Sequence, residues 1–224
     1  MSTRMVEVRA KVLKQNDLLA NALREKFHKD GTCVVGLVSS PGSGKTALLE
    51  KLLGSLAREH RVAALVGDLA TENDAARLKR ATPNVKQITT GTICHLDAQM
   101  VQKAIDSWDS WDLGAPDFLF IENVGNLVCP SSYDLGEELR FVLLSVTEGE
   151  DKPLKYPTIF NSSDVAVITK MDLAAAAEFD IAAARRNIAG VRPGMQIFEV
   201  SSKTGLGMED LVSFLRAQHS RPIA

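Results

Sequence analysis

The chain has 224 residues, a length that corresponds to one globular domain with modest extensions, since a domain takes roughly 100–200 residues. Hydrophobic residues make up 45% and charged residues 24% of the sequence, which supports a packed core and excludes a mainly disordered or collagenous chain. The 26 Lys and Arg against 28 Asp and Glu leave a formal charge of −2, which gives no electrostatic reason to expect nucleic acid or an anionic membrane as a partner.

No apolar run approaches the roughly 18–20 residues that span a bilayer, and the charges spread through residues 1–30 exclude the apolar core of a secretory signal. We therefore expect a cytoplasmic protein. Three cysteines are an odd number in a reducing compartment, which argues against a disulfide framework. Metal ligation, catalysis and core filling remain as their possible roles.

The order of the predicted elements indicates a doubly wound α/β fold. Apolar residues at helical spacing predict an amphipathic helix over residues 6–28, so we expect residues 1–30 to form an N-terminal helical extension of a domain that spans residues 31–224. Short apolar runs rich in β-branched residues, typical of strands buried on both faces, lie at residues 33–38, 62–66, 85–88, 118–121, 141–146, 165–168 and 196–200. Most are separated by segments long enough for a helix, which predicts a mostly parallel sheet. The segment before residue 141 leaves little room for a helix, and there we expect one antiparallel or irregular neighbour.

A glycine-rich loop follows the first predicted strand. Residues 39–46 read SSPGSGKT and lead into a helical pattern, so that backbone N–H groups and a helix N-terminus converge on one point, as phosphate binding requires. This pattern predicts a P-loop, in which Lys45 reaches the β- and γ-phosphates and the Thr46 hydroxyl binds Mg²⁺. Ser39 stands where the first glycine of the motif is usual, and a Gly/Ser turn before a helix is the alternative. The nucleotide-binding residues predicted in this loop are Gly42, Ser43, Gly44, Lys45, Thr46 and Ala47.

Two later strands end in residues typical of a guanine site. Residues 169–172 read TKMD and residues 201–203 read SSK. The Asp172 carboxylate can accept hydrogen bonds from both the ring N–H and the exocyclic amine of guanine, which adenine does not present, while the Lys170 stem covers the base. Together with Ser202 and Lys203, these residues predict GTP as the nucleotide. Thr169 stands where Asn is usual, and a solvated loop is the alternative.

Two carboxylates close buried strands. Asp68 follows the strand predicted at residues 62–66 and Glu122 follows the one at residues 118–121. Ligands bind at the carboxyl ends of parallel strands, so both carboxylates can approach the magnesium held by Thr46, and Asp68 can orient the attacking water. We predict Lys45, Asp68 and Glu122 as catalytic residues and Thr46, Asp68 and Glu122 as magnesium ligands. Capping of the following helix is the alternative for each carboxylate.

Cysteine and histidine side chains follow two of the predicted strands. Cys94 and His95 are adjacent at a loop–helix junction, and Cys129 lies in the loop after Glu122. Thiolate and imidazole ligands suit nickel or zinc, not magnesium, so these three residues are candidate ligands of a soft metal ion. A small buried Cys beside a polar His is the alternative. Cys33 lies within a strand, where we expect it to fill the core.

The motifs together resemble the HypB GTPases, which assist nickel delivery to [NiFe]-hydrogenase. The resemblance rests on residues 118–130, which read FLFIENVGNLVCP, on residues 133–137, on residues 92–96 and on residues 148–153, and it covers nearly the whole chain. It implies a SIMIBI-class P-loop GTPase domain with inserted metal-binding loops, a homodimer favoured by GTP, and Ni²⁺ or Zn²⁺ held by Cys94, His95 and Cys129.

The resemblance also implies partners: hydrogenase-maturation proteins and the large-subunit precursor of [NiFe]-hydrogenase. We therefore expect a cytoplasmic GTPase that uses Mg²⁺ with GTP and assists nickel insertion, with low intrinsic hydrolysis because no residue is an obvious catalytic glutamine or arginine finger. Residues 1–11 contain neither the Cys-rich nickel motif nor the His-rich tract of many bacterial members, so we expect no nickel storage there. Two alternatives stay open: a GTPase chaperone for another metalloenzyme such as urease, and a metal-binding regulatory module without significant turnover.

Overall fold

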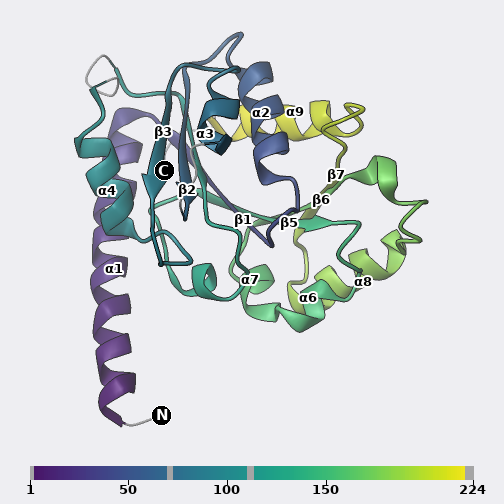
Figure 1. The fold of residues 1–224 in the computed structure, drawn as a ribbon, viewed down its shortest axis with the longest axis horizontal. Coiled ribbons are helices and arrows are strands. Elements are labelled where there is room, and N and C mark those ends of the chain that lie inside the picture. The colour runs from purple at the N-terminus through teal and green to yellow at the C-terminus, as the bar shows by residue number, and fades with distance from the viewer. Residues whose placement is uncertain (1–2, 70–72, 110–113, 220–224) are drawn as a thin grey trace.

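The described strands form one sheet in which every pairing is parallel, so that their carboxyl ends lie at the same edge. The computed structural model describes residues 3–69, 73–109 and 114–219. The strand order is β3-β2-β4-β1-β5-β6-β7 (Figure 1). The strands are β1 (Cys33–Ser39), β2 (Val62–Asp68), β3 (Val85–Thr89), β4 (Phe118–Glu122), β5 (Leu139–Ser145), β6 (Val165–Thr169) and β7 (Gln196–Glu199). The doubly wound fold expected from the sequence is confirmed.

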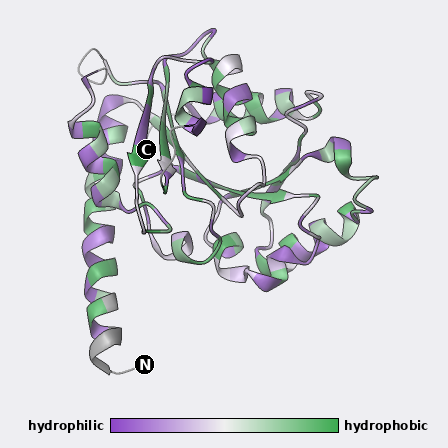
Figure 2. Ribbon diagram, viewed as in Figure 1, coloured by the Kyte–Doolittle hydropathy of each residue, from purple (hydrophilic) through white to green (hydrophobic). Residues whose placement is uncertain are grey.

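Helices cover both faces of the sheet. Alternate side chains of β1 show this arrangement: Val35 packs in one cluster with α2 and α9, whereas Val34 packs with α1 and α4 on the opposite face, and Val38 with α7 and α8. The strands at the centre of the sheet are green in Figure 2 because they carry apolar residues towards both faces. The helices are α1 (Thr3–Asp30), α2 (Lys45–Leu56), α3 (Asn73–Leu78), α4 (Ala98–Asp106), α6 (Lys152–Lys155), α7 (Pro157–Asn161), α8 (Ile181–Val191) and α9 (Met208–His219), with short 3₁₀ turns η1 (Cys129–Ser132) and η2 (Met171–Leu173).

The long helix α1 packs on the sheet through its C-terminal half. Leu23 and Phe27 are buried against α4 and the sheet. The N-terminal half extends beyond the body of the protein (Figure 1), and Val8 and Val12 are exposed on it. The helix predicted over residues 6–28 is present, while a division of the chain at residue 30 into extension and domain stays a prediction. Among the described helices, none combines the length and the apolar character needed to cross a lipid bilayer.

The connection between β4 and β5 corrects one expectation. An antiparallel or irregular neighbour was expected at residues 141–146, but β5 begins at Leu139 and pairs in parallel with both β1 and β6. Two parallel strands of one sheet, such as β4 and β5 on either side of β1, require a crossover of about a dozen residues or more, which is usually an α-helix. Residues 123–138 provide that length as a loop with only the turn η1 in it. The lack of a helical pattern before β5 therefore did not indicate that this strand runs antiparallel to its neighbours.

Candidate functional site

The loop between β1 and α2 is held in shape by its own side chains and by β6. Lys45 Nζ donates a hydrogen bond to the buried Ser39 Oγ at 2.9 Å, and Ser43 Oγ also bonds to Ser39 Oγ. Gly44, which directly precedes α2, has a φ of 97°, a left-handed conformation that residues with a side chain rarely adopt. From β6, Thr169 Oγ1 donates to the backbone oxygen of Ser43 at 2.7 Å. Ser39 thus takes the place of the usual glycine by serving as a hydrogen-bonding partner for the loop.

Glu122 and Thr46 form a site suited to a hard cation. Glu122 Oε1 accepts a hydrogen bond from Thr46 Oγ1 at 2.8 Å, whereas the buried Glu122 Oε2 has no hydrogen-bond partner among the described residues. Burial raises the pKa of the Glu122 carboxyl to about 7, against the opposing effects of the Lys45 ammonium and the Thr46 hydroxyl. Burial also lowers the pKa of Lys45. An unpaired carboxylate oxygen beside a threonine hydroxyl is the kind of donor set that Mg²⁺ takes, so these residues fit that ion.

A cavity of about 420 Å³ opens at the carboxyl edge of the sheet above this loop. It is lined by Gly42, Gly44, Lys45, Thr46, Ala47, Asp68, Asp74, Arg77 and Glu122, together with neighbouring residues of the same loops. Asp68 is half-buried and its Oδ1 accepts from the backbone N–H of Leu69 at 2.6 Å. Arg77 pairs with Glu50 at 2.7 Å. The structure thus gathers the two predicted carboxylates and the predicted loop residues around one space, except for Ser43, which is buried and does not line the cavity.

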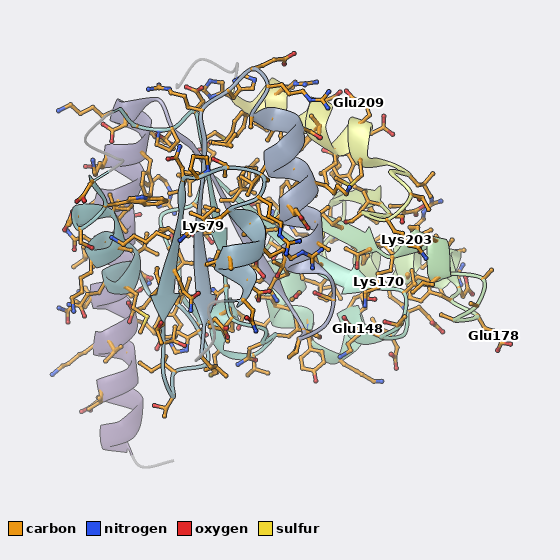
Figure 3. The ribbon with its side chains drawn as sticks, turned by 45° about the horizontal axis from the view of Figure 1, so that its top comes forward. Lys79, Glu148, Lys170, Glu178, Lys203 and Glu209 are labelled. Carbon is orange, nitrogen blue, oxygen red and sulfur yellow. The ribbon has the colours of Figure 1, made fainter. Side chains whose placement is uncertain are left out.

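The residues predicted to recognise guanine lie at the ends of β6 and β7. Asp172 Oδ1 accepts a hydrogen bond from Ser201 Oγ at 2.6 Å, and Lys203 Nζ lies 3.9 Å from Asp172 Oδ2. Lys170, with a left-handed φ of 59°, donates from Nζ to the backbone oxygen of Gly42 at 2.6 Å. Figure 3 labels Lys170 and Lys203 on the side of the molecule that carries these two strands. Ser202, next to Ser201, is half-buried. The contact of Lys170 with Gly42 brings this group of residues next to the phosphate loop.

The predicted soft-metal ligands come together from two loops. The Sγ atoms of Cys94 and Cys129 are 2.9 Å apart, and one ligand atom from each of Cys94, His95 and Cys129 fits within 4.8 Å of the others. His95 Nδ1 is buried without a hydrogen-bond partner in the part of the chain that the structure describes, and burial lowers the pKa of this imidazole. Tyr133 lies against the His95 ring, with the ring centroids 4.0 Å apart. Two thiols and a neutral, unpaired imidazole nitrogen are donors that nickel and zinc prefer, so this cluster fits either ion.

Asn123 connects the two sites, and the sequence patterns did not single it out. It follows Glu122 directly and is buried. Its Oδ1 accepts hydrogen bonds from the backbone N–H of Leu96 at 3.0 Å and from that of Val124 at 2.9 Å. Leu96 follows His95, so a single side chain joins the end of β4 to the loop that carries the candidate metal ligands. The only local signal was an asparagine at a strand end, which is common in loops.

The charged residues around Lys152, between Gly149 and Pro153, favour equally a contact across the interface of the expected dimer and a solvated loop. Lys152 begins the short helix α6, and its Nζ lies 3.4 Å from Ser40 Oγ and 3.7 Å from Glu148 Oε2. Within the single chain, therefore, this lysine contacts the phosphate loop. A role across an interface stays a prediction.

The fold and the loop define a P-loop nucleotide-binding protein. The sheet is parallel, a glycine loop follows β1, and the buried Lys45 stands at the N-terminus of α2. Comparison with family models gives a match over residues 33–199 to the family described as CobW/HypB/UreG, nucleotide-binding domain. This chain belongs to that family, as the resemblance in its motifs predicted.

Similar proteins carry the name HypB. The Escherichia coli (strain K12) hydrogenase maturation factor HypB is 44% identical over 215 residues, which cover 96% of this chain and 73% of that protein. The Helicobacter pylori (strain ATCC 700392 / 26695) hydrogenase/urease maturation factor HypB is 43% identical over 216 residues, which cover 96% of this chain and 88% of that protein. A crystal structure of HypB from Helicobacter pylori in complex with nickel superimposes with a TM-score of 0.86 at 41% identity, covering 93% of this chain and all of that one.

More distant structures share the fold alone. FlhF complexed with GMPPNP and Mg²⁺ matches with a TM-score of 0.55 at 18% identity over 82% of this chain and 73% of that one. This likeness supports the doubly wound P-loop fold that the sequence predicts.

Proposed function

We propose that this chain is a cytoplasmic GTP-hydrolysing metallochaperone that binds Ni²⁺ or Zn²⁺ and assists nickel insertion into the large-subunit precursor of a [NiFe]-hydrogenase. The observation that carries the proposal is the pairing of two sites. Thr46 and Glu122 meet at 2.8 Å in the phosphate-loop cavity, and the ligand atoms of Cys94, His95 and Cys129 gather within 4.8 Å one short loop away. Hydrogenase-maturation proteins are the expected partners.

The chemistry of the nucleotide site is transfer of the γ-phosphoryl group to water. Lys45 and the backbone N–H groups of residues 42–46 bind the phosphate oxygens and stabilise the charge that develops on them. Mg²⁺ with GTP supplies further charge neutralisation, and Thr46, Glu122 and Asp68 would hold it. Asp68 lines the same cavity, and we assign to it the orientation of the attacking water. A low intrinsic rate is expected because the described residues around the cavity include no glutamine.

Guanine selectivity is assigned to the ends of β6 and β7. The Asp172 carboxylate accepts from the two N–H groups that guanine presents side by side, while the Lys170 stem covers the base. The Ser201 hydroxyl holds the carboxylate from the other side, which fixes its orientation. Ser202 and Lys203 complete the edge of this site.

The metal ion is the cargo of this protein. The alternative that the receiving enzyme is a urease is favoured by one specific observation, the name hydrogenase/urease maturation factor carried by the relative from Helicobacter pylori. Both readings require the same chemistry of this chain, which is to hold a soft divalent ion and to release it according to the bound nucleotide. The two alternatives are distinguished by mixing the nickel-loaded protein with purified precursor of the hydrogenase or of the urease and measuring which precursor acquires nickel.

Metal titration of ligand variants tests the cargo site. We expect Cys94→Ala and His95→Ala to abolish tight Ni²⁺ and Zn²⁺ binding, and Cys129→Ala to weaken it, because each change removes one of the three donor atoms that the described residues bring together. GTP binding should stay nearly unchanged. The measurement is competition with a chromophoric chelator for the metal and calorimetry for GTP.

Cys33→Ala is the matched control. Cys33 is a buried core residue in β1, and burial raises the pKa of its thiol to about 12, so it is neither accessible nor ionised for metal binding. Its removal should leave the metal affinity unchanged. Tight metal binding that survives in both Cys94→Ala and His95→Ala would contradict the assignment of the site.

A further inference from the structure

The C-terminal half of α1 lies against both chain segments that carry the candidate metal ligands. We call residues 94–98 the first arm and residues 129–136 the second arm. Leu23 of α1 is buried in one cluster with Leu96 of the first arm and Leu135 of the second. Figure 1 shows α1 running beside α4, which continues the first arm. The helix therefore has a direct contact with each half of the metal centre.

One buried side chain of α1 hydrogen bonds to both arms. Asn16 Nδ2 donates to the backbone oxygen of Asp134 in the second arm at 2.9 Å. Asn16 Oδ1 accepts from the backbone N–H of Ala98, at the end of the first arm, also at 2.9 Å. Only 7% of Asn16 is exposed. A carboxamide holds its donor and its acceptor on one rigid plane, so the two bonds fix the separation of the arms.

The second arm also contacts a candidate metal ligand, so its position relative to α1 affects that ligand. Arg24, two turns further along α1, donates from one guanidinium nitrogen to both carboxylate oxygens of Asp134 at 2.7 Å. Asp134 follows Tyr133, whose ring lies against His95 with a centroid distance of 4.0 Å. The attachment of α1 to the second arm is thus one residue away from a contact with a ligand of the first arm. A substitution of Asn16 would therefore alter the separation of the two arms.

We propose that Asn16 is a positioning residue of the metal centre: its two hydrogen bonds hold the arms at the separation that brings Cys94 Sγ and Cys129 Sγ within reach of one ion. The expected effect on metal affinity rests on the proposed metal-binding function. Its geometric part, the closeness of the two thiols, exists without any metal. By this assignment α1 is a structural part of the metal centre, and displacement of the helix changes metal affinity.

Two variants separate the two hydrogen bonds. Asn16→Leu removes both while keeping a similar volume. Asn16→Asp keeps an oxygen that accepts from Ala98 and removes the donor to Asp134, so it breaks the hydrogen bond to the second arm alone. Thr32→Val is the matched control: Thr32 is buried just beyond the C-terminus of α1, and its Oγ1 donates to the backbone oxygen of Pro116 at 2.7 Å, away from both arms. This substitution removes a buried hydrogen bond that lies away from the metal centre.

The first measurement uses reduced, metal-free protein and dibromobimane, which fluoresces only after both of its bromomethyl groups have reacted with thiols. The unaltered protein should bridge Cys94 and Cys129, and Cys129→Ala should give no signal. We expect both Asn16 variants to slow the bridging several-fold relative to Thr32→Val. The second measurement is Ni²⁺ affinity by chelator competition, where we expect a loss of about 10–100-fold, as is usual for residues that orient metal ligands.

The outcomes separate this inference from the proposed function. Slower bridging and weaker nickel binding in the Asn16 variants, with neither change in Thr32→Val, support the inference. Bridging rates equal to that of Thr32→Val overturn it, because Asn16 then contributes only to stability. If the unaltered protein binds no nickel but the Asn16 variants still bridge slowly, the positioning role stands and the proposed cargo site fails. If Asn16→Leu does not fold, Asn16→Asp gives the same comparison.

Discussion

Asp172 is the single residue on which the choice of nucleotide depends most directly. Asp172→Asn replaces one acceptor oxygen by a donor that faces the guanine N–H groups, and the mismatch of buried polar groups should cost about 1–3 kcal/mol. We expect GTP affinity to fall by roughly one to two decades. Because Ser201 Oγ can still donate to the remaining amide oxygen, the change should leave the fold intact.

Calorimetric titration with GTP and with ATP measures this effect. The phosphate loop does not distinguish the two nucleotides, so the weak ATP affinity of the variant should equal that of the unaltered protein. Equal binding of ATP and GTP by the unaltered protein would remove the basis for a guanine site at Asp172.

Among single residues, the sequence predicted those whose roles depend on local pattern. The phosphate loop and the cysteine–histidine pair have neighbours in the chain that define them. Thr169, by contrast, stood out only as a departure from the usual asparagine, yet its hydroxyl holds the oxygen of Ser43, which is 126 positions away. Asn16 bonds to backbone groups 82 and 118 positions away. No pattern in one sequence reveals a partner at such separations, since the contact exists only once the chain has folded.

At the scale of elements, the strands were predictable because a strand buried on both faces must be apolar throughout. All seven predicted runs correspond to strands, with ends that differ by a residue or two. The connection between β4 and β5 was not predictable in the same way. Residues 123–138 form no α-helix and so carry no helical pattern, and their structure depends on contacts with α1 and the phosphate loop. Gly125 shows the second contact, since a Cβ atom there would stand 3.0 Å from Pro41 Cα.

The attachment of that connection to α1 should depend on pH through Asp134. Burial alone would raise the pKa of this carboxyl, but hydrogen bonds from Arg24 and from the backbone of Gly136 outweigh it and hold the pKa below its ordinary value of 3.8. A carboxyl with a lowered pKa in the folded state stabilises the fold above its unfolded pKa. That contribution is lost as the pH falls through the folded pKa.

Asp134→Asn tests this reasoning. The variant should be less stable than the unaltered protein at pH 7, and the difference should shrink below about pH 4, where the unaltered carboxyl becomes protonated. Urea midpoints at pH 7, 5 and 3 provide the measurement. Gln15→Ala, at an exposed position of α1 and without a titratable group, is the control, and its difference from the unaltered protein should be the same at all three pH values. A difference that is constant with pH would show that the Arg24 contact does not depend on the charge of Asp134.

At the scale of the whole molecule, we predict that GTP with Mg²⁺ favours a homodimer. The prediction follows from the family resemblance and from the position of the nucleotide cavity at an open edge of the sheet, where Lys152 already contacts the phosphate loop. Sedimentation velocity should show a larger mass with a non-hydrolysable GTP analogue than with GDP. Lys45→Ala, which loses the phosphate contact, should stay monomeric with both nucleotides. Monomers in both states across micromolar concentrations would contradict the prediction.

The whole molecule must also couple its two sites if the nucleotide is to control metal release. Glu122 lies at the nucleotide cavity, and the next residue, Asn123, accepts a hydrogen bond from Leu96 at 3.0 Å, directly after His95. A movement of the end of β4 between the GTP and GDP states therefore reaches the first arm through one side chain. It reaches Cys129 through the seven positions that separate this residue from Glu122.

We predict that Ni²⁺ affinity differs between the GDP and GTP-analogue states by a factor in the usual range of roughly 5–150 for coupled sites. Linkage requires that nickel change the ratio of the GDP and GTP-analogue affinities by that same factor, so two independent titrations must give one number. Cys129→Ala should weaken metal binding and reduce the factor, because the loop that moves with Glu122 no longer carries a ligand. Asn123→Ala should reduce the factor while leaving all three ligands in place. Identical nickel affinities of the unaltered protein in both nucleotide states would mean that the metal site is not controlled by the nucleotide, since a ligand that binds two states equally cannot shift the balance between them.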